Sequence, residues 1–146
     1  MSDKPFTFEE FKKIYSQVPR LCIDIVVRNS EGTLLTLRKI PPHKGQWHLP
    51  GGTLLFKEPI RDAIQRIAKN ELGISVEVGK FLGYIEFMNQ DEFGGFDHPI
   101  SLLFLCSPKT QTYKPDEQSE SIQFFRRIPN NTIKEHKEFL ENPANA

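Results

Sequence analysis

Residues 51–74 of the chain read GGTLLFKEPIRDAIQRIAKNELGI, in which a double glycine is followed by a glutamate and then by an amphipathic segment. The apolar residues of this segment recur at helical spacing and predict one buried stripe, made of Ile60, Ala63, Ile64, Ile67, Ala68 and Leu72. Pro59 suits the first turn of this helix, and Gly73 suits its C-terminal cap. A tight turn that leads into a helix with a carboxylate is one way to hold Mg²⁺ beside a diphosphate.

The composition predicts one globular domain over residues 1–146. The chain is 38% hydrophobic and 26% charged, and its length allows a buried core without disulfides. Its 19 basic and 19 acidic residues give a net charge of zero, which argues against nucleic acid or membranes as partners bound by bulk charge. Cys22 and Cys106 each lie in an apolar run and are expected to be buried thiols. Because no apolar signal segment or spanning run occurs, we expect a cytoplasmic location.

The flanking sequence predicts a sheet with helices before, within and after it. A capping box at 7–10 opens a short helix to about Ser16, and a second at 132–135 opens a terminal helix to about Leu140, with a frayed tail from Asn142. Strands are expected over residues 21–28, 33–39, 53–56, 74–88, 100–106 and 121–127, with loops over 40–50, 89–97 and 107–120. Several connections have hairpin length, so we expect a layered α/β domain with a mixed sheet.

The polar residues of the opening stretch fall in one register. Glu58 lies six residues after Gly52, Arg66 lies eight after Glu58, and Glu71 lies five after Arg66 and is followed by Leu-Gly-Ile. This pattern resembles the Nudix box, G-x5-E-x7-R-E-U-x-E-E-x-G-U, in which U is aliphatic, and the upstream sequence of residues 47–52 is also typical of that family. The resemblance implies a Nudix α/β/α sandwich with a mixed β-sheet over essentially the whole chain. It also implies Mg²⁺-dependent hydrolysis of a nucleoside diphosphate linked to another group.

Two positions of the box depart from the family pattern. Ile67 stands where the family has a glutamate after the arginine, and Asn70 stands where it has the first glutamate of the later pair. Because residues three and four apart share a helix face, the usual box presents several carboxylates to a cluster of metal ions. This chain keeps Glu71 alone at those positions, so we expect a single Mg²⁺ ion. Ile67 is expected to extend the apolar stripe of the helix.

The replacements over residues 66–73 resemble the altered box of GDP-mannose mannosyl hydrolases. In that branch, water attacks the anomeric carbon of the sugar and the nucleoside diphosphate leaves intact. The resemblance implies a small-molecule nucleotide sugar, such as GDP-mannose, as the substrate. It also implies a homodimer, for which Phe8 and Phe11 could supply an interface, although both rings could equally pack on their own sheet.

The same resemblance implies which groups hold the metal ion. The Gly51 carbonyl, Glu71 and Gln118 would be the protein ligands of one Mg²⁺ on the diphosphate. Gly51 and Gly52 have no side chains, so the backbone there can approach a ligand closely. Cations that neutralise the charge of a departing diphosphate would make it leave more readily.

Further roles are implied for residues outside the metal site. Arg38, which Lys39 could assist, would steady the phosphates or the leaving group. Arg66 would buttress the site through Glu58. Asp24 lies mid-strand between apolar residues, so its carboxylate faces either solvent or the site, and the resemblance favours the sugar or nucleotide.

Two residues leave the reaction type open. Thr53 stands where the related branch has an arginine, and Ser119 stands where it has a histidine base. A serine hydroxyl is a poor general base compared with an imidazole. The loss of a general base lowers the rate by about 10²–10⁴-fold. The alternatives are ordinary cleavage to a nucleoside monophosphate and a sugar phosphate, or a module that binds nucleotides without turnover.

Of the nearby histidines, we expect His43 and His48 to face solvent, and we expect Trp47 to be a packing anchor.

Overall fold

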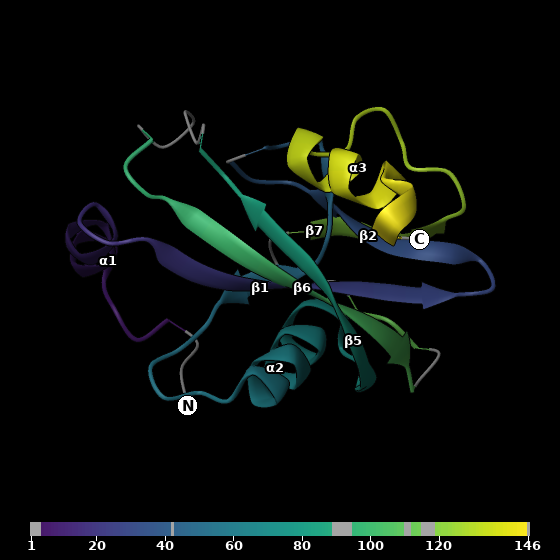
Figure 1. Cartoon of the computed structure of the whole chain (residues 1–146), viewed down its shortest axis with the longest axis horizontal. Coiled ribbons are helices and arrows are strands. Elements are labelled where there is room, and N and C mark those ends of the chain that lie inside the picture. Colours follow the sequence, from purple (N-terminus) through teal and green to yellow (C-terminus); the bar gives the residue numbers. More distant parts are fainter. Residues whose placement is uncertain (1–3, 42, 89–94, 110–111, 115–118, 146) are drawn as a thin grey trace.

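A mixed β-sheet lies between helices on its two faces (Figure 1). The computed structural model describes residues 4–41, 43–88, 95–109, 112–114 and 119–145. The elements run in the order α1 (Phe8–Tyr15), β1 (Arg20–Asn29), β2 (Gly32–Arg38), β3 (Trp47–His48), β4 (Gly51–Thr53), α2 (Ile60–Leu72), β5 (Val76–Glu86), β6 (Pro99–Pro108), β7 (Ser119–Phe125), α3 (Lys134–Glu141) and the 3₁₀ turn η2 (Pro143–Asn145). The predicted mixed α/β architecture is confirmed.

Strand β1 is the centre of the sheet and changes partners along its length. It pairs parallel with β6 from Arg20 to Val27, and it pairs antiparallel with β2 only at its C-terminal end, where Arg28 lies opposite Thr33. At its N-terminal half β4 takes that place, with Asp24 opposite Gly51. β2 continues away from β1 and pairs with β3 on that edge, while β7 pairs with its other edge from Thr33 to Arg38. This exchange of partners brings the double glycine beside a buried carboxylate.

Two apolar clusters occupy the two faces of the sheet. The cluster under α2 contains Ile23, Ile25, Val27, Leu34, Ala63, Ile64, Ile67, Ala68, Leu72, Ile74, Val76 and Cys106. The cluster under α3 contains Val26, Leu35, Leu49, Ile85, Phe87, Leu103 and Leu140. Alternate residues of β1 therefore serve opposite faces, with Ile23 and Ile25 toward α2 and Val26 toward α3. Figure 1 shows α2 and α3 on opposite sides of the strands.

The first two helices begin and end as predicted. Thr7 Oγ1 accepts a hydrogen bond from the Glu10 N–H at 3.2 Å, and the Glu10 carboxylate accepts one from the Thr7 N–H at 2.9 Å, so the capping box is confirmed. α2 follows Pro59 and ends at Gly73, whose φ of 69° is left-handed. These ends are set by local sequence alone.

The predicted capping box before α3 is wrong. The N-cap is Ile133, and no side chain caps the helix. Thr132 is instead buried and bridges to Trp47, whose carbonyl accepts a hydrogen bond from the Ile133 N–H at 2.9 Å. Pairing with β3 holds the chain extended up to the helix. Residues 143–145 of the tail, which was expected to fray, form the turn η2, and Arg28 donates a hydrogen bond to the Asn145 carbonyl at 3.1 Å.

Several strand boundaries differ from the prediction. The short strand expected over 53–56 is β4, Gly51–Thr53, because its register follows the pairing with β1 rather than side-chain propensity. The loop expected over 40–50 contains β3. The long strand expected over 74–88 is β5, with irregular register around Gly83, where a break was expected. Parts of the loops expected over 89–97 and 107–120 lie outside the described residues.

Candidate metal and substrate site

The main chain of Gly51 meets the carboxylate of Glu71. Across the β1–β4 pairing the Ile25 N–H donates to the Pro50 carbonyl at 2.9 Å, so the next residue, Gly51, turns its own N–H and C=O away from β1. The Gly51 N–H donates to Glu71 Oε2 at 2.7 Å. Because the N–H and C=O of one strand residue point to the same side, the Gly51 carbonyl faces the side on which Glu71 lies.

This arrangement fits a divalent cation. Mg²⁺ prefers carboxylate and carbonyl oxygens, and Glu71 and Gly51 present one of each on the same side of β4. No cluster of His, Cys, Asp and Glu side chains suited to a metal occurs within the described ranges. Gln118, the third predicted ligand, lies outside the described residues.

Asp24 borders Gly51 from the other face of the sheet. Its side chain is buried, and Oδ2 lies 3.1 Å from Nε2 of His136 on α3. A Cβ added to Gly51 would lie 1.8 Å from Asp24 Oδ1, so the carboxylate packs directly on the glycine. The alternative that Asp24 faces solvent is therefore wrong, whereas a contact with the sugar or nucleotide stays a prediction.

His136 is the residue that sequence reasoning missed. Its Nδ1 accepts a hydrogen bond from the Leu49 N–H at 3.1 Å, and it lies 112 positions from Asp24. A sequence signal existed, because His136 and Leu140 are four residues apart and both lie buried on the inner side of α3. That spacing indicates a buried histidine but gives no information about its partners.

Arg66 of α2 forms an ion pair with Glu58, which lies between β4 and α2, and two hydrogen bonds join the two side chains. Arg66 Nε and Nη2 donate to the two Glu58 oxygens at 2.8 and 2.9 Å, and Nη2 also donates to the Thr53 carbonyl at 2.9 Å. The hydrogen bonds from Arg66 lower the pKa of Glu58 below its ordinary value, against an opposing effect of burial. The pair thereby ties α2 to the end of β4, as a buttress would, and its effect on activity stays a prediction.

Ile67 replaces a carboxylate with hydrocarbon on the inner face of α2. It is buried in the cluster under α2, which confirms that it extends the apolar stripe. A Cβ added to Gly52 would lie 3.6 Å from Ile67 Cγ1, an ordinary contact. Asn70, the other departure from the box, is exposed.

Arg38 is the last residue of β2, and Lys39 follows it directly. Arg38 is half-buried, its Nη2 donates to the Pro41 carbonyl at 3.4 Å, and its backbone pairs with Ser119 at the start of β7. Lys39 is exposed. β7 therefore begins beside Arg38, and the phosphate-binding roles of Arg38 and Lys39 stay predictions.

A guanidinium reaches Thr53 from β1. Arg20 Nη1 donates to Thr53 Oγ1 at 2.7 Å, and Arg20 Nε pairs with Asp97 Oδ2 at 2.9 Å. The same guanidinium lies 5.3 Å from the centre of the Phe11 ring. A positive charge therefore lies against the Thr53 hydroxyl, a contact that sequence reasoning did not predict.

His48 does not face solvent as expected. It is buried, its Nδ1–H donates to the Leu49 carbonyl at 2.8 Å, and its Nε2 accepts from the Thr36 hydroxyl at 3.0 Å. Burial lowers its pKa to about 4, so the ring is neutral at physiological pH. Trp47 meets Phe125 edge to face at 4.7 Å between ring centres, as expected of a packing anchor.

The two cysteines are buried, as expected. Cys22 and Cys106 are buried and free, and burial raises their pKa values to about 12 and about 11. No helix in the described residues has the length and apolar content that a membrane span requires.

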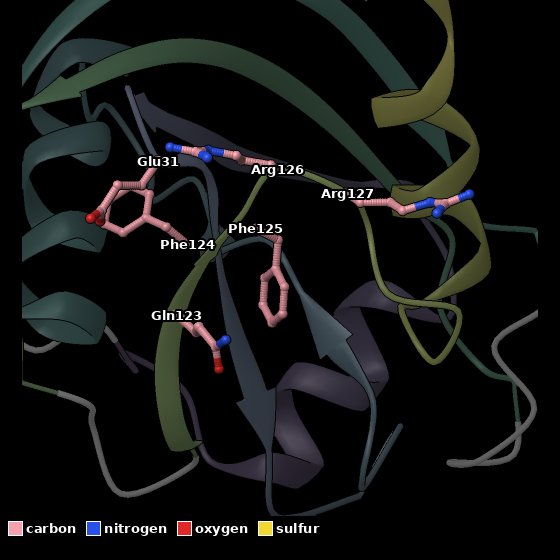
Figure 2. Close-up of a pocket in the computed structure, with 6 residues that line it drawn as sticks. All are labelled: Glu31, Gln123, Phe124, Phe125, Arg126 and Arg127. Carbon is pink, nitrogen blue, oxygen red and sulfur yellow. The ribbon is translucent and has the colours of Figure 1, made fainter.

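A separate surface depression lies elsewhere (Figure 2). It is lined by Glu31, Gln123, Phe124, Phe125, Arg126 and Arg127. The β2–β7 register pairs Phe125 with Thr33 and Ser119 with Arg38, so this depression lies at the opposite end of β7 from Arg38. None of the predicted site residues that the structure describes lines it.

Comparison with known proteins identifies the family of the chain. The NUDIX domain family model matches residues 18–144. A relative from Haloferax volcanii, a low-salt glycan biosynthesis protein, is 32% identical over 130 residues, which are 85% of this chain and 83% of that protein. The chain therefore belongs to the Nudix hydrolase family, whose members generally use a divalent metal such as Mg²⁺.

Two further proteins are similar to the chain. An ADP-ribose pyrophosphatase from Methanocaldococcus jannaschii is 29% identical over 107 residues, which are 73% of this chain and 62% of that protein. The crystal structure of a MutT NUDIX hydrolase from Burkholderia pseudomallei aligns with a TM-score of 0.77 at 24% identity, covering 86% of this chain and 98% of that one. The latter likeness establishes the Nudix fold.

Proposed function

We propose that the protein is a Mg²⁺-dependent hydrolase of a nucleotide sugar, with GDP-mannose first in line, and that it releases a nucleoside diphosphate and free sugar. The observation that carries the proposal is the meeting of the Gly51 main chain with the Glu71 carboxylate. A Mg²⁺ ion bound there would neutralise charge that develops on the leaving diphosphate. The glycan biosynthesis relative supports a substrate that contains a sugar.

The chain's own residues supply the other parts of this reaction. Arg38 and Lys39 bring positive charge to the end of β2, where the phosphates would lie. Asp24 presents a carboxylate to the sugar or nucleotide. The oxygen of water bonds to the anomeric carbon, the bond from that carbon to the phosphate oxygen breaks, and the electron pair leaves with the diphosphate. The water proton passes to a base or to solvent.

The test is a panel of nucleotide sugars incubated with protein and Mg²⁺ in ¹⁸O-labelled water. We expect the label on the sugar, which is the signature of attack at carbon. Label on the phosphate would instead establish cleavage to a nucleoside monophosphate and a sugar phosphate. Binding without any turnover across the panel would favour a nucleotide-binding module and would refute the hydrolase proposal.

Glu71→Gln tests the metal assignment within the same assay. Glutamine keeps an oxygen that can accept from the Gly51 N–H, so the fold should survive, but it removes the charge that binds Mg²⁺. We expect kcat/KM to fall by about 100-fold or more, because even the outer partners of metal ligands are worth about 10–100-fold. Undiminished activity would show that Glu71 is not a metal ligand.

A second candidate substrate is ADP-ribose. It is favoured by the Methanocaldococcus jannaschii relative, whose name describes it as an ADP-ribose pyrophosphatase. ADP-ribose has a free anomeric centre and a diphosphate between two sugars, so its cleavage must occur at phosphorus. Including ADP-ribose in the labelled-water panel therefore separates the two candidates by product as well as by rate.

A homodimer and a cytoplasmic location complete the proposal. Phe8 is 61% exposed and Phe11 is half-buried, although both rings meet Phe96 edge to face at 6.1 and 6.2 Å. The exposed Phe8 supports an interface on α1. Sedimentation of the protein and of Phe8→Ser measures this directly, and a monomeric native protein would refute the dimer.

A further inference from the structure

The last helix brings a buried histidine to the face of Gly51 that α2 does not reach. We propose that His136 is a positioning residue of this site, and that its imidazole fixes both the Asp24 carboxylate and the main chain of residues 49–51. The inference rests on the proposed function, because it concerns the groups that would bind Mg²⁺ and substrate. His136 acts through these groups and has no role in contacting the substrate itself.

The two contacts of His136 specify one state of its ring. The Leu49 N–H donates to Nδ1 at 3.1 Å, so Nδ1 carries no proton. Nε2 then carries the proton of the neutral ring and donates to Asp24 Oδ2 at 3.1 Å. The other tautomer would set two N–H groups against each other at Leu49 and leave Asp24 without its donor. Only the Nε2–H form satisfies both partners.

These contacts hold Gly51 on two sides. Leu49 lies two residues before Gly51 in the chain, and Asp24 lies opposite Gly51 in the sheet. The Asp24 carboxylate packs so closely on Gly51 that a Cβ there would lie 1.8 Å from Oδ1. From the other side Glu71 accepts the Gly51 N–H. The direction of the Gly51 carbonyl therefore depends on α3 through His136 as well as on α2 through Glu71.

The stability of the fold alone does not explain why Asp24 and His136 are buried as a pair. Asp24 is 7% exposed and His136 is 5% exposed, and the Phe87 ring meets the imidazole edge to face at 5.7 Å. Polar groups cost free energy when they are buried, even where hydrogen bonds offset most of it. Apolar side chains of similar size would often stabilise such a position at least as well. A carboxylate and an imidazole are therefore better explained by the geometry that they impose on Gly51.

Two substitutions separate the two contacts. In His136→Asn the side-chain oxygen lies near the Nδ1 position and can accept from the Leu49 N–H, but the side chain is too short for Asp24. In His136→Gln the amide nitrogen reaches the Nε2 position and can donate to Asp24, while the Leu49 contact is lost. Glu138→Gln changes an exposed residue of the same helix and serves as the control.

The readout is Mg²⁺ binding to the full chain, followed through the ¹H–¹⁵N signal of the Gly51 amide. We expect each His136 variant to raise the Mg²⁺ concentration for half-saturation by about 10-fold or more, as for other outer partners of metal sites. Glu138→Gln should match the native protein. Urea unfolding of the same samples shows that the variants are folded. Folded His136 variants with native Mg²⁺ affinity would overturn the inference.

The native protein gives a second test that no folding defect can obscure. In two-bond ¹H–¹⁵N spectra we expect His136 to carry its proton on Nε2 and none on Nδ1. Its ring signals should move together with the Gly51 amide as Mg²⁺ alone is added. The opposite tautomer, or signals of either residue that do not respond to Mg²⁺, would overturn the inference.

Failure of the proposed function has a different signature. If Mg²⁺ moves the Gly51 and His136 signals but no substrate is hydrolysed, the hydrolase proposal is wrong and the positioning role stands. If nucleotide sugars are hydrolysed while the His136 signals stay fixed, the positioning role is wrong and the hydrolase proposal stands.

Discussion

Helices α2 and α3 both reach Gly51, but they do so by opposite means. α2 contacts the glycine through Glu71, and it is tied to β4 by the charged Arg66–Glu58 pair. α3 acts from the other face through the buried His136, which contacts Leu49 before β4 and Asp24 opposite Gly51 on β1. One helix thus contributes charge near the surface, and the other contributes a neutral ring within the interior.

The difference shows that one site can draw on two kinds of sequence information. The residues of α2 that matter lie within the 24 residues of the opening stretch, where fixed spacing relates them to Gly51. The α3 contact joins positions 87 and 112 apart, so no local spacing encodes it. A family motif therefore describes only the half of the site that is local in the chain.

The largest expected effect concerns the charged attachment of α2. Arg66→Ala leaves the Glu58 carboxylate, whose side chain is 10% exposed, without its two-bond partner. We expect a loss of about 3 kcal/mol in the free energy of unfolding, measured by urea denaturation. Lys137→Ala on α3 is the matched control, since its exposed pair with Glu141 is worth about 0.5 kcal/mol. Equal losses from both variants would remove the contrast between the helices.

The next prediction concerns the glycine between the helices. In Gly51→Ala the new Cβ would meet Asp24 Oδ1 at 1.8 Å and the Ile23 carbonyl at 2.8 Å, so β4 must shift. We expect a loss of about 2 kcal/mol by thermal or urea unfolding. Gly52→Ala is the control, because among the described residues the nearest neighbour of its Cβ is Ile67, at an ordinary contact distance of 3.6 Å.

Comparing the two glycine variants can contradict this prediction. If Gly52→Ala destabilises the protein as much as Gly51→Ala, the close packing of Asp24 on Gly51 is not what restricts this strand. Adding Asp24→Ala to Gly51→Ala should recover part of the lost stability, since it removes the nearer clash.

The smallest effect is a pH dependence that comes from the buried His48 of β3, which lies outside both helices. Burial lowers the pKa of His48 from 6.5 to about 4, so the unfolded chain binds a proton that the folded protein does not. Stability from this group is complete above pH 6.5 and is lost as the pH falls toward 4. We expect His48→Gln to abolish about 1 kcal/mol of the decline between pH 7 and 5.5. Parallel pH profiles for the native and variant proteins would contradict this.

The sequence predicted those parts of the molecule that depend on local rules. The start and end of α2, the capping box of α1 and the apolar role of Ile67 follow from spacing and cap chemistry, and the structure has all three. The bounds of β4 and the start of α3 were not predictable in this way. β4 takes its register from β1, and Thr132 pairs with Trp47 instead of capping its helix.

The candidate site divides along the same line. The contact of Arg66 with Glu58 and the position of Glu71 beside Gly51 follow from the register of the motif. The motif could not predict the contacts of His136 and Arg20, because each residue reaches the site from a distant part of the chain through the folded sheet. Identifying such partners requires tertiary packing, which a single sequence does not reveal.

The distance along the chain between Asp24 and His136 also bears on biosynthesis. The ribosome makes Asp24 112 residues before His136. At translation speeds of about 5–20 residues per second, the nascent carboxylate waits on the order of 10 s for its imidazole. During that interval the Asp24 carboxylate lacks the hydrogen-bond donor that orients it in the folded protein.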